Sequence, residues 1–206
     1  MADQSAQLSR RAVFRGALGV AVLGAGAGAD AALAGCGAAE KPGVTTGPYG
    51  VAVWAITYRG TIHPDQRDRG PARAGWPAAG YDVAAGVDFV PHLAEHAPVD
   101  LDGQRTVLLG HSAGGHLATW AASRSQLEED QVGAHPTVKP LGCVSMAGVY
   151  DLIPAHQARD YVSAATAGHD PAELSVVANA DHNSWTVPDH PAWSVARGHV
   201  LELVGL

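Results

Sequence analysis

The sequence predicts an α/β protein with a mostly parallel β-sheet flanked by helices. Short runs rich in Val, Ile and aromatic residues alternate along the chain with segments whose apolar residues recur every three or four positions, and this alternation is typical of parallel α/β sheets. At 206 residues, 47% of them hydrophobic, the chain is long enough to bury one sizeable core rather than two. We therefore expect one folded domain.

Charge, cysteine content and motifs exclude several functional classes. The formal net charge of -7 provides no basic surface for a phosphate backbone, so a nucleic-acid partner is not expected. The two cysteines, Cys36 and Cys143, do not predict a disulfide framework. The sequence has no His-Glu-x-x-His, Cys-x-x-Cys or Gly-x-x-x-x-Gly-Lys-Ser/Thr motif, so we predict neither a metal site nor a cofactor.

Residues 1–36 have the layout of an export signal. Arg10 and Arg11 precede a weakly apolar stretch at 16–35, which is typical of a twin-arginine signal. The stretch ends in Leu-Ala-Gly-Cys, which resembles the lipobox of bacterial lipoproteins and makes Cys36 the predicted lipidation site. A retained transmembrane helix is the alternative, but frequent glycine disfavours it. We expect an exported protein of the cell envelope or a secreted one, with membrane contact only through the lipid anchor.

Behind a linker at 37–48, the predicted folded domain covers 49–206. Its first strand, 49–60, is rich in Val, Ile, Tyr and Trp. The first helix is expected at 78–97, with Pro91 bending or ending it. The apolar residues of this helix fall three or four positions apart, at Val83, Val87, Val90 and Leu93.

The second half of the chain continues the alternation of strands and helices. Its predicted strands are short apolar runs, and its predicted helices have apolar residues at helical spacing. The expected strands are 105–110, 141–150 and 173–180, and the expected helices are 112–124, 155–167 and 191–204.

Residues 106–120, TVLLGHSAGGHLATW, contain a Gly-x-Ser-x-Gly motif. A strand leads directly into the motif and a helix leaves it, as a nucleophile elbow requires. The glycines let the two chain segments approach, and the helix N-terminus directs backbone N–H groups at a developing oxyanion. Ser112 is therefore the candidate nucleophile, and the N–H of Ala113 is a candidate oxyanion donor. The alternative is an ordinary strand-to-helix turn in which Ser112 caps the helix.

The stretch LLGHSAGGHLATWAA resembles the elbow of α/β-hydrolase-fold serine hydrolases, in particular bacterial esterases and lipases of the kynurenine-formamidase-like branch. YGVAVWAITYRG, GWPAAGYDVAAGVDFV and ANADHNSW are also similar to family segments, so the resemblance covers most of 49–204. It implies an α/β-hydrolase fold and a Ser-His-Asp triad. The implied substrate is a small-molecule carboxylic ester or aryl formamide.

The resemblance also suggests the partners of the serine. His182 is the candidate base, because it lies between the last predicted strand and the last helix and its neighbours match the family's histidine loop. The acid follows the serine and precedes the histidine in this fold. Asp151, in GVYDLIP, resembles the segment that carries it but also a segment that does not, so Asp160, Asp170 and Asp181 stay open as alternatives.

Two further residues near the expected site are candidates for lining a substrate pocket, Trp185 and His111. Two family features are missing from the sequence: a His-Gly-Gly loop before 49–60, and a central strand. We therefore expect a shortened α/β hydrolase that lacks one or two family strands. Losing one oxyanion donor costs about 2.7 to 4 kcal/mol, so the competing hypothesis is a non-catalytic or vestigial envelope-anchored module on the same scaffold.

Overall fold

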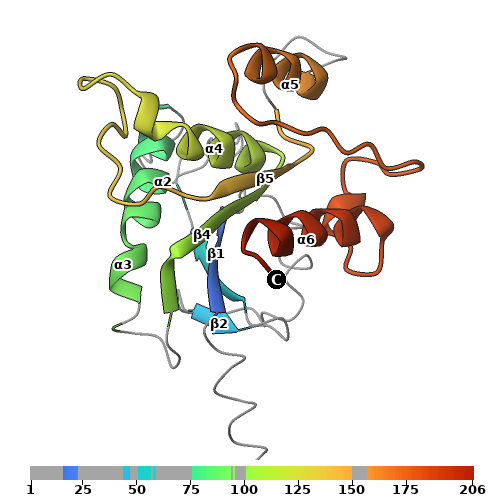
Figure 1. The fold of residues 1–206 in the computed structure, drawn as a ribbon, viewed down its shortest axis with the longest axis horizontal. Helices are drawn as coiled ribbons and strands as arrows, with labels where there is room; N and C mark the ends of the chain where they lie inside the picture. The colour runs from blue at the N-terminus through green and yellow to red at the C-terminus, as the bar shows by residue number, and fades with distance from the viewer. Residues whose placement is uncertain are drawn as a thin grey trace, which may run out of the picture.

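The computed structural model contains a five-stranded sheet in the order β2-β3-β1-β4-β5 (Figure 1). Strand β1 (Gly16–Val22) pairs in parallel with β3 (Ala52–Ile56) and with β4 (Leu101–His111). Strand β5 (Gly142–Met146) pairs in parallel with β4, and β2 (Val44–Thr46) is an antiparallel edge strand. The predicted mostly parallel sheet is therefore confirmed. The structure describes residues 16–22, 44–46, 51–56, 58, 76–93, 95, 101–149 and 157–206.

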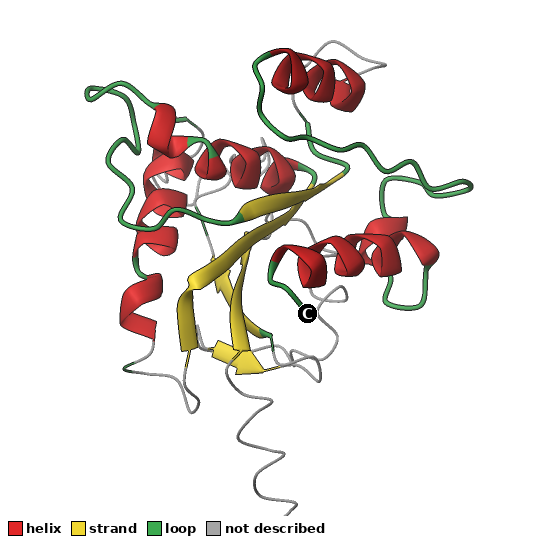
Figure 2. Ribbon diagram, viewed as in Figure 1, coloured by secondary structure: helices red, strands yellow, loops and turns green. Residues whose placement is uncertain are grey.

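Helices cover both faces of the sheet (Figures 1 and 2). Helices α2 (Ala78–Asp88), α3 (Val90–Leu93) and α4 (Ala113–Ala122) lie on one side, and α6 (Pro191–Leu203) lies on the other. Helix α5 (Gln157–Ala167) lies away from the sheet. Layers of helix on both faces of a parallel sheet agree with the expected α/β class.

Alternating side chains of β4 build the core on both of its faces. Leu108 packs in the larger cluster with α2, α3 and α4, whereas Val107 packs with Val204 after α6. Successive strand residues point to opposite faces, so one strand supports both helical layers. The helical spacing predicted for the first helix is also confirmed, because the four residues that carried it are buried: Val83, Val87, Val90 and Leu93.

Two strands come from segments in which the sequence analysis placed none. Strand β1 lies inside the predicted export signal, and β2 lies inside the predicted linker. The expectation of a missing central strand was wrong, because β1 occupies the position between β3 and β4. Most of the predicted signal, Cys36 included, is outside the described residues. No helix in the described ranges is long and apolar enough to cross a bilayer.

The strand expected at 173–180 does not form. Asn179 has a left-handed φ of 58°, the N–H of Ala180 donates to the carbonyl of Val177 in a turn, and Val176 is 71% exposed. The β-branched residues predicted a strand, but β-propensity is expressed only where the segment itself lies against a neighbouring strand. Within the described ranges no strand pairs with the outer edge of β5.

The predicted first helix is interrupted at Phe89, two residues before Pro91. The proline lies in the first turn of α3, where a missing N–H costs little. The expected bend is therefore present, but it divides the segment into two helices.

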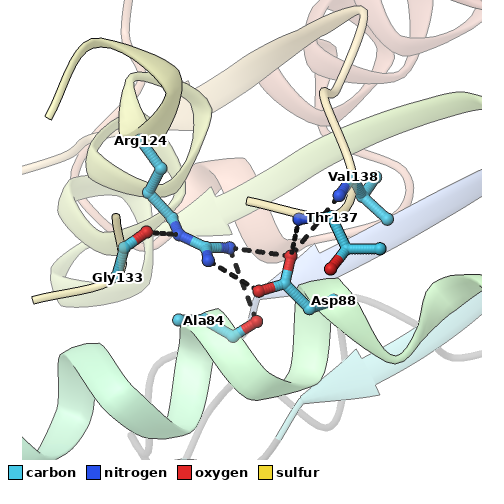
Figure 3. Close-up of polar contacts among 6 residues, drawn as sticks. All are labelled: Ala84, Asp88, Arg124, Gly133, Thr137 and Val138. Carbon is cyan, nitrogen blue, oxygen red and sulfur yellow. Dashed lines mark hydrogen bonds and ion pairs between the residues drawn. The ribbon is translucent and has the colours of Figure 1, made fainter. Parts of the chain in front are cut away.

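A buried ion pair fixes the end of α4 that lies away from Ser112 (Figure 3). Arg124, in the 3-10 helix η3 (Arg124–Gln126), donates to both carboxylate oxygens of Asp88 at 3.2 and 2.6 Å. Its Nε donates to the carbonyl of Gly133 at 2.7 Å. The same carboxylate accepts from the backbone N–H groups of Thr137 and Val138. One guanidinium and one carboxylate thus join α2, η3 and the loop that leads to β5.

Candidate active site

Ser112 occupies a sharp turn between β4 and α4. Its backbone has φ 56° and ψ -121°, a combination that costs a non-glycine residue about 1 to 3 kcal/mol and persists only where the surroundings impose it. The N–H of Ser112 donates to the carbonyl of Met146 at 2.9 Å, and its carbonyl accepts from the N–H of His116 at 3.2 Å. The Ser112 side chain does not cap α4, so the alternative of a capping serine is wrong.

The glycines around Ser112 are required by close approach. A Cβ on Gly110 would overlap the carbonyl of Gly114. A Cβ on Gly115 would lie 2.5 Å from the Oγ of Ser145 and 3.0 Å from the Cα of Gly148. The strand and the helix therefore meet closely because Gly110 and Gly115 carry no side chain. The Gly-x-Ser-x-Gly motif predicted the close approach at Gly110, whereas Gly115 lies one residue beyond the motif.

The carboxyl ends of the parallel strands converge at this turn. Val22, the last residue of β1, pairs with Ile56 at the end of β3 and with Gly110 near the end of β4. Ligands of open α/β sheets bind at this edge. Helix α4 begins here with Ala113, which is exposed. The first backbone N–H groups of a helix have no partner within it and attract negative charge.

The loop of His182 lies against the residue that precedes Ser112. The Nε2 of His111 is 2.7 Å from the backbone carbonyl oxygen of His182, and the two imidazole rings are 4.7 Å apart between centroids. A carbonyl oxygen only accepts hydrogen bonds, so Nε2 of His111 carries the proton. The structure thus brings together two segments 71 residues apart in the sequence, the elbow and the predicted histidine loop.

Asp181 organises the histidine loop through its carboxylate. Its Oδ1 accepts from the N–H of Asn183 at 2.9 Å and from the N–H and the hydroxyl of Ser184, each at 2.8 Å. The hydroxyl and backbone of Ser184, followed by the backbone of Asn183, lower the pKa of Asp181 below its ordinary 3.8. Asp181 therefore serves the turn that carries His182.

The other predicted site residues differ in how exposed they are and in whether the structure describes them. Asp160, in the first turn of α5, and Asp170 are both exposed. Trp185 is half-buried in the 3-10 helix η4 (Ser184–Thr186), directly after the histidine loop. Asp151 lies outside the described residues, so its role as the acid stays a prediction.

Two features of the described residues concern thiol and metal chemistry. Burial raises the pKa of the Cys143 thiol, and a bond to the Thr119 hydroxyl only partly opposes this. Reactive cysteines require the opposite shift. The described residues include no group of three or more His, Cys, Asp or Glu side chains placed to hold a metal ion.

Comparison with protein families identifies the chain. The BD-FAE family model matches residues 48–190, more than half of the sequence. The chain belongs to the BD-FAE family. The match includes Ser112 and His182 and begins after the predicted export signal. No curated protein sequence matches this BD-FAE chain.

Solved structures similar to this BD-FAE protein include an esterase and a candidate carboxylesterase. Esterase 2 of Thermogutta terrifontis phosphoramylated by tabun superposes with a TM-score of 0.61 at 15% identity, covering 94% of this chain and 85% of the esterase. The same esterase with butyrate bound superposes with a TM-score of 0.57 at 16% identity, and the coverage of the two chains is the same. A candidate carboxylesterase of Lactobacillus plantarum superposes with a TM-score of 0.56 at 18% identity, covering 92% of this chain and 89% of the carboxylesterase. The α/β-hydrolase-like fold is therefore confirmed, and the family and fold support ester hydrolysis in general terms.

Sequence reasoning missed how the histidine loop is held. It treated His111 as a candidate pocket residue and gave Ser184 no role, whereas His111 bonds to the carbonyl oxygen of His182 and Ser184 donates to the carboxylate of Asp181. The pattern Asp-x-x-Ser at 181–184 is a local signal for such a turn, because Asp and Ser side chains cap backbone N–H groups two or three residues away. The bond from His111 has no signal in the sequence.

Proposed function

We propose that this BD-FAE protein is a serine esterase in which Ser112 is the nucleophile and His182 is the general base. The observation that carries the proposal is the left-handed Ser112 turn together with the His182 loop bonded to the adjacent residue, His111. A serine hydroxyl is a weak nucleophile until a base removes its proton, and a base on this loop is close to the elbow. The proposed acid that orients His182 is Asp151.

In the proposed reaction, Ser112 Oγ forms a bond to the carbonyl carbon of the ester while His182 accepts the hydroxyl proton. The carbonyl oxygen becomes an oxyanion, and the N–H of Ala113 donates to it at the start of α4. When the tetrahedral intermediate collapses, the ester C–O bond breaks and His182 returns the proton to the leaving alcohol. Water, deprotonated by His182, then releases the carboxylic acid from Ser112. An aryl formamide follows the same route with an amine as the leaving group.

The decisive experiment compares two serines in the same protein. Ser175 is a matched control, because its Oγ is 2.8 Å from Nε2 of His199 but it lies outside any strand-to-helix elbow. We expect a fluorophosphonate probe to label the wild type and Ser175→Ala, and to leave Ser112→Ala unlabelled. Hydrolysis of p-nitrophenyl butyrate is expected to fall by roughly a thousandfold or more in Ser112→Ala. Equal labelling of the wild type and Ser112→Ala overturns the proposal.

The choice of probe and substrate follows from the similar structures, one phosphoramylated by tabun and one with butyrate bound. His182→Ala is expected to abolish turnover as well. Asp151→Asn should be more damaging than Asp160→Asn or Asp170→Asn if it supplies the acid. Absence of both labelling and turnover in the wild type would instead favour the non-catalytic scaffold.

We also propose, from the sequence alone, that the chain is exported and lipidated at Cys36. Incorporation of radiolabelled palmitate in a bacterial host that depends on Cys36, and on Arg10 and Arg11, tests both steps. Cleavage before Cys36 would remove β1 from the sheet, so the export proposal requires a mature domain that folds without this strand.

A further inference from the structure

We propose that His111 is a positioning residue for catalysis, which holds His182 in register with Ser112. This inference rests on the proposed function, since it assumes that His182 is the base. It concerns the variable position inside the Gly-x-Ser-x-Gly motif, which the elbow geometry itself does not constrain to any residue type.

The first argument is the hydrogen bond between the two segments. His111 is the last residue of β4, pairs with Met146 in β5 and immediately precedes Ser112. Its Nε2–H donates to the carbonyl oxygen of His182 at 2.7 Å, a short distance for an N–H···O bond. Because β4 is interior to the sheet, this donor is fixed on a rigid element, whereas His182 is exposed on a loop. The bond therefore transfers the rigidity of the sheet to the loop.

The second argument is that, among the described residues, the bonds made by the Asp181 side chain and backbone N–H stay within the loop itself. The Asp181 carboxylate accepts from Asn183 and Ser184, and the N–H of Asp181 donates to the Ser184 hydroxyl oxygen at 3.0 Å. These bonds define the shape of the turn, but they do not connect it to the elbow. His111 supplies a connection from the elbow to this turn, and this bond helps to set where the turn lies relative to Ser112.

The third argument is the contact between the rings. The imidazoles of His111 and His182 are 4.7 Å apart between centroids and inclined by 48°. This packing restricts the orientation of the His182 ring, and proton transfer from a serine depends on that orientation. His111 thus holds the backbone of His182 through the hydrogen bond from Nε2, and it restricts the His182 ring through the packing of the two imidazoles.

The test uses three variants with matched geometry. His111→Leu removes the donor and the ring, and His111→Gln retains an amide N–H at about the position of Nε2. His116→Leu is the control, because His116 also flanks the elbow but is exposed on α4. Far-UV circular dichroism and the midpoint of urea unfolding confirm that each variant is folded.

We expect His111→Leu to lower kcat for p-nitrophenyl butyrate about 10- to 100-fold with KM changed less than about twofold, as misplacement of a catalytic group does. In His111→Gln, kcat should stay within about threefold of the wild-type value. In His116→Leu, kcat should equal the wild-type value. A higher KM at unchanged kcat would make His111 a pocket residue and overturn the proposal. Unchanged kcat in His111→Leu, or no recovery in His111→Gln, would overturn it too.

A spectroscopic measurement separates this inference from the proposed function. In protein labelled with ¹⁵N-histidine, His111 should carry its proton on Nε2, and the ring signals of His182 should shift in His111→Leu but not in His116→Leu. This holds even if the wild type hydrolyses no ester, in which case the proposed function fails alone. Unchanged His182 signals in His111→Leu would overturn the positioning role whatever the activity.

Discussion

Replacing Asp88 by asparagine tests the buried ion pair that closes one end of α4 (Figure 3). The Arg124 side chain is 2% exposed and the Asp88 side chain 26% exposed. Removing the carboxylate charge leaves a buried guanidinium without a counter-charge, with the amide oxygen of Asn at position 88 and the backbone carbonyls of Gly133 and Ala84 as its acceptors. Breaking a buried pair from one side typically costs about 3 to 5 kcal/mol. We expect about 3 kcal/mol for Asp88→Asn, since water reaches the exposed part of residue 88.

The reverse substitution should be milder, which makes the prediction specific. Arg124→Met removes the buried charge with its donors, while Asp88 still accepts from the N–H groups of Thr137 and Val138. We expect a loss of about 1 to 2 kcal/mol from the hydrogen bonds that disappear. In the double variant no buried charge is left uncompensated, so its stability should be close to that of Arg124→Met alone. The coupling energy should then equal the loss in Asp88→Asn, about 3 kcal/mol.

Urea unfolding monitored by circular dichroism measures the four stabilities, with the m-value checking that unfolding stays two-state. Arg159→Met is the control, because Arg159 is exposed on α5, and it should change stability by less than about 0.5 kcal/mol. A loss below about 1 kcal/mol in Asp88→Asn, a larger loss in Arg124→Met, or additivity of the two substitutions would each refute the reasoning.

Three further predictions concern the site and the sheet. Gly110→Ala places a Cβ on the carbonyl of Gly114, so fluorophosphonate labelling should slow on the order of a hundredfold; Gly198→Ala, whose Cβ meets no described atom within 4 Å, should label normally. Hydrogen bonds lower the pKa of Asp181 below 3.8 in the folded state. Asp181→Asn should therefore reduce the thermal midpoint above about pH 4, and the gap between the midpoints of the wild type and the variant should vanish as pH falls through the folded pKa. A gap that grows in acid contradicts this. A chain starting at Cys36 lacks β1, so the export proposal requires this chain to keep a cooperative transition in urea unfolding, and loss of that transition relative to the full chain would count against cleavage at Cys36.

The elbow and the first helix were predictable because their signals are local. The Gly-x-Ser-x-Gly motif fixes a turn within five residues, and the close approach of Gly110 and Gly114 is a property of that turn alone. The apolar residues from Val83 to Leu93 are three or four positions apart, and residues at this spacing lie on one face of a helix, so the pattern predicts the face that is buried. In both cases the sequence near a residue determines its structure.

The errors arose where structure depends on distant partners. The residues at 173–180 have the composition of a strand, but a strand forms only where the fold brings the segment against a neighbouring strand, and composition does not reveal where the segment will lie. The contact of His111 with His182 joins segments 71 residues apart. A single sequence contains both residues, but it does not show that they are in contact in the folded protein.

Strand β1 is the most instructive case, because its sequence fits two opposite fates. Gly16–Val22 reads GALGVAV, and an interior parallel strand, covered on both faces, is usually an uncharged apolar run without alternation. The apolar region of an export signal has the same composition, so hydropathy does not distinguish them. Pairing does, since β1 bonds to β3 on one side and to β4 on the other, and a cleaved leader bonds to neither. One molecule cannot use the segment in both ways, so the N-terminal residue of the mature protein also determines whether its sheet contains β1.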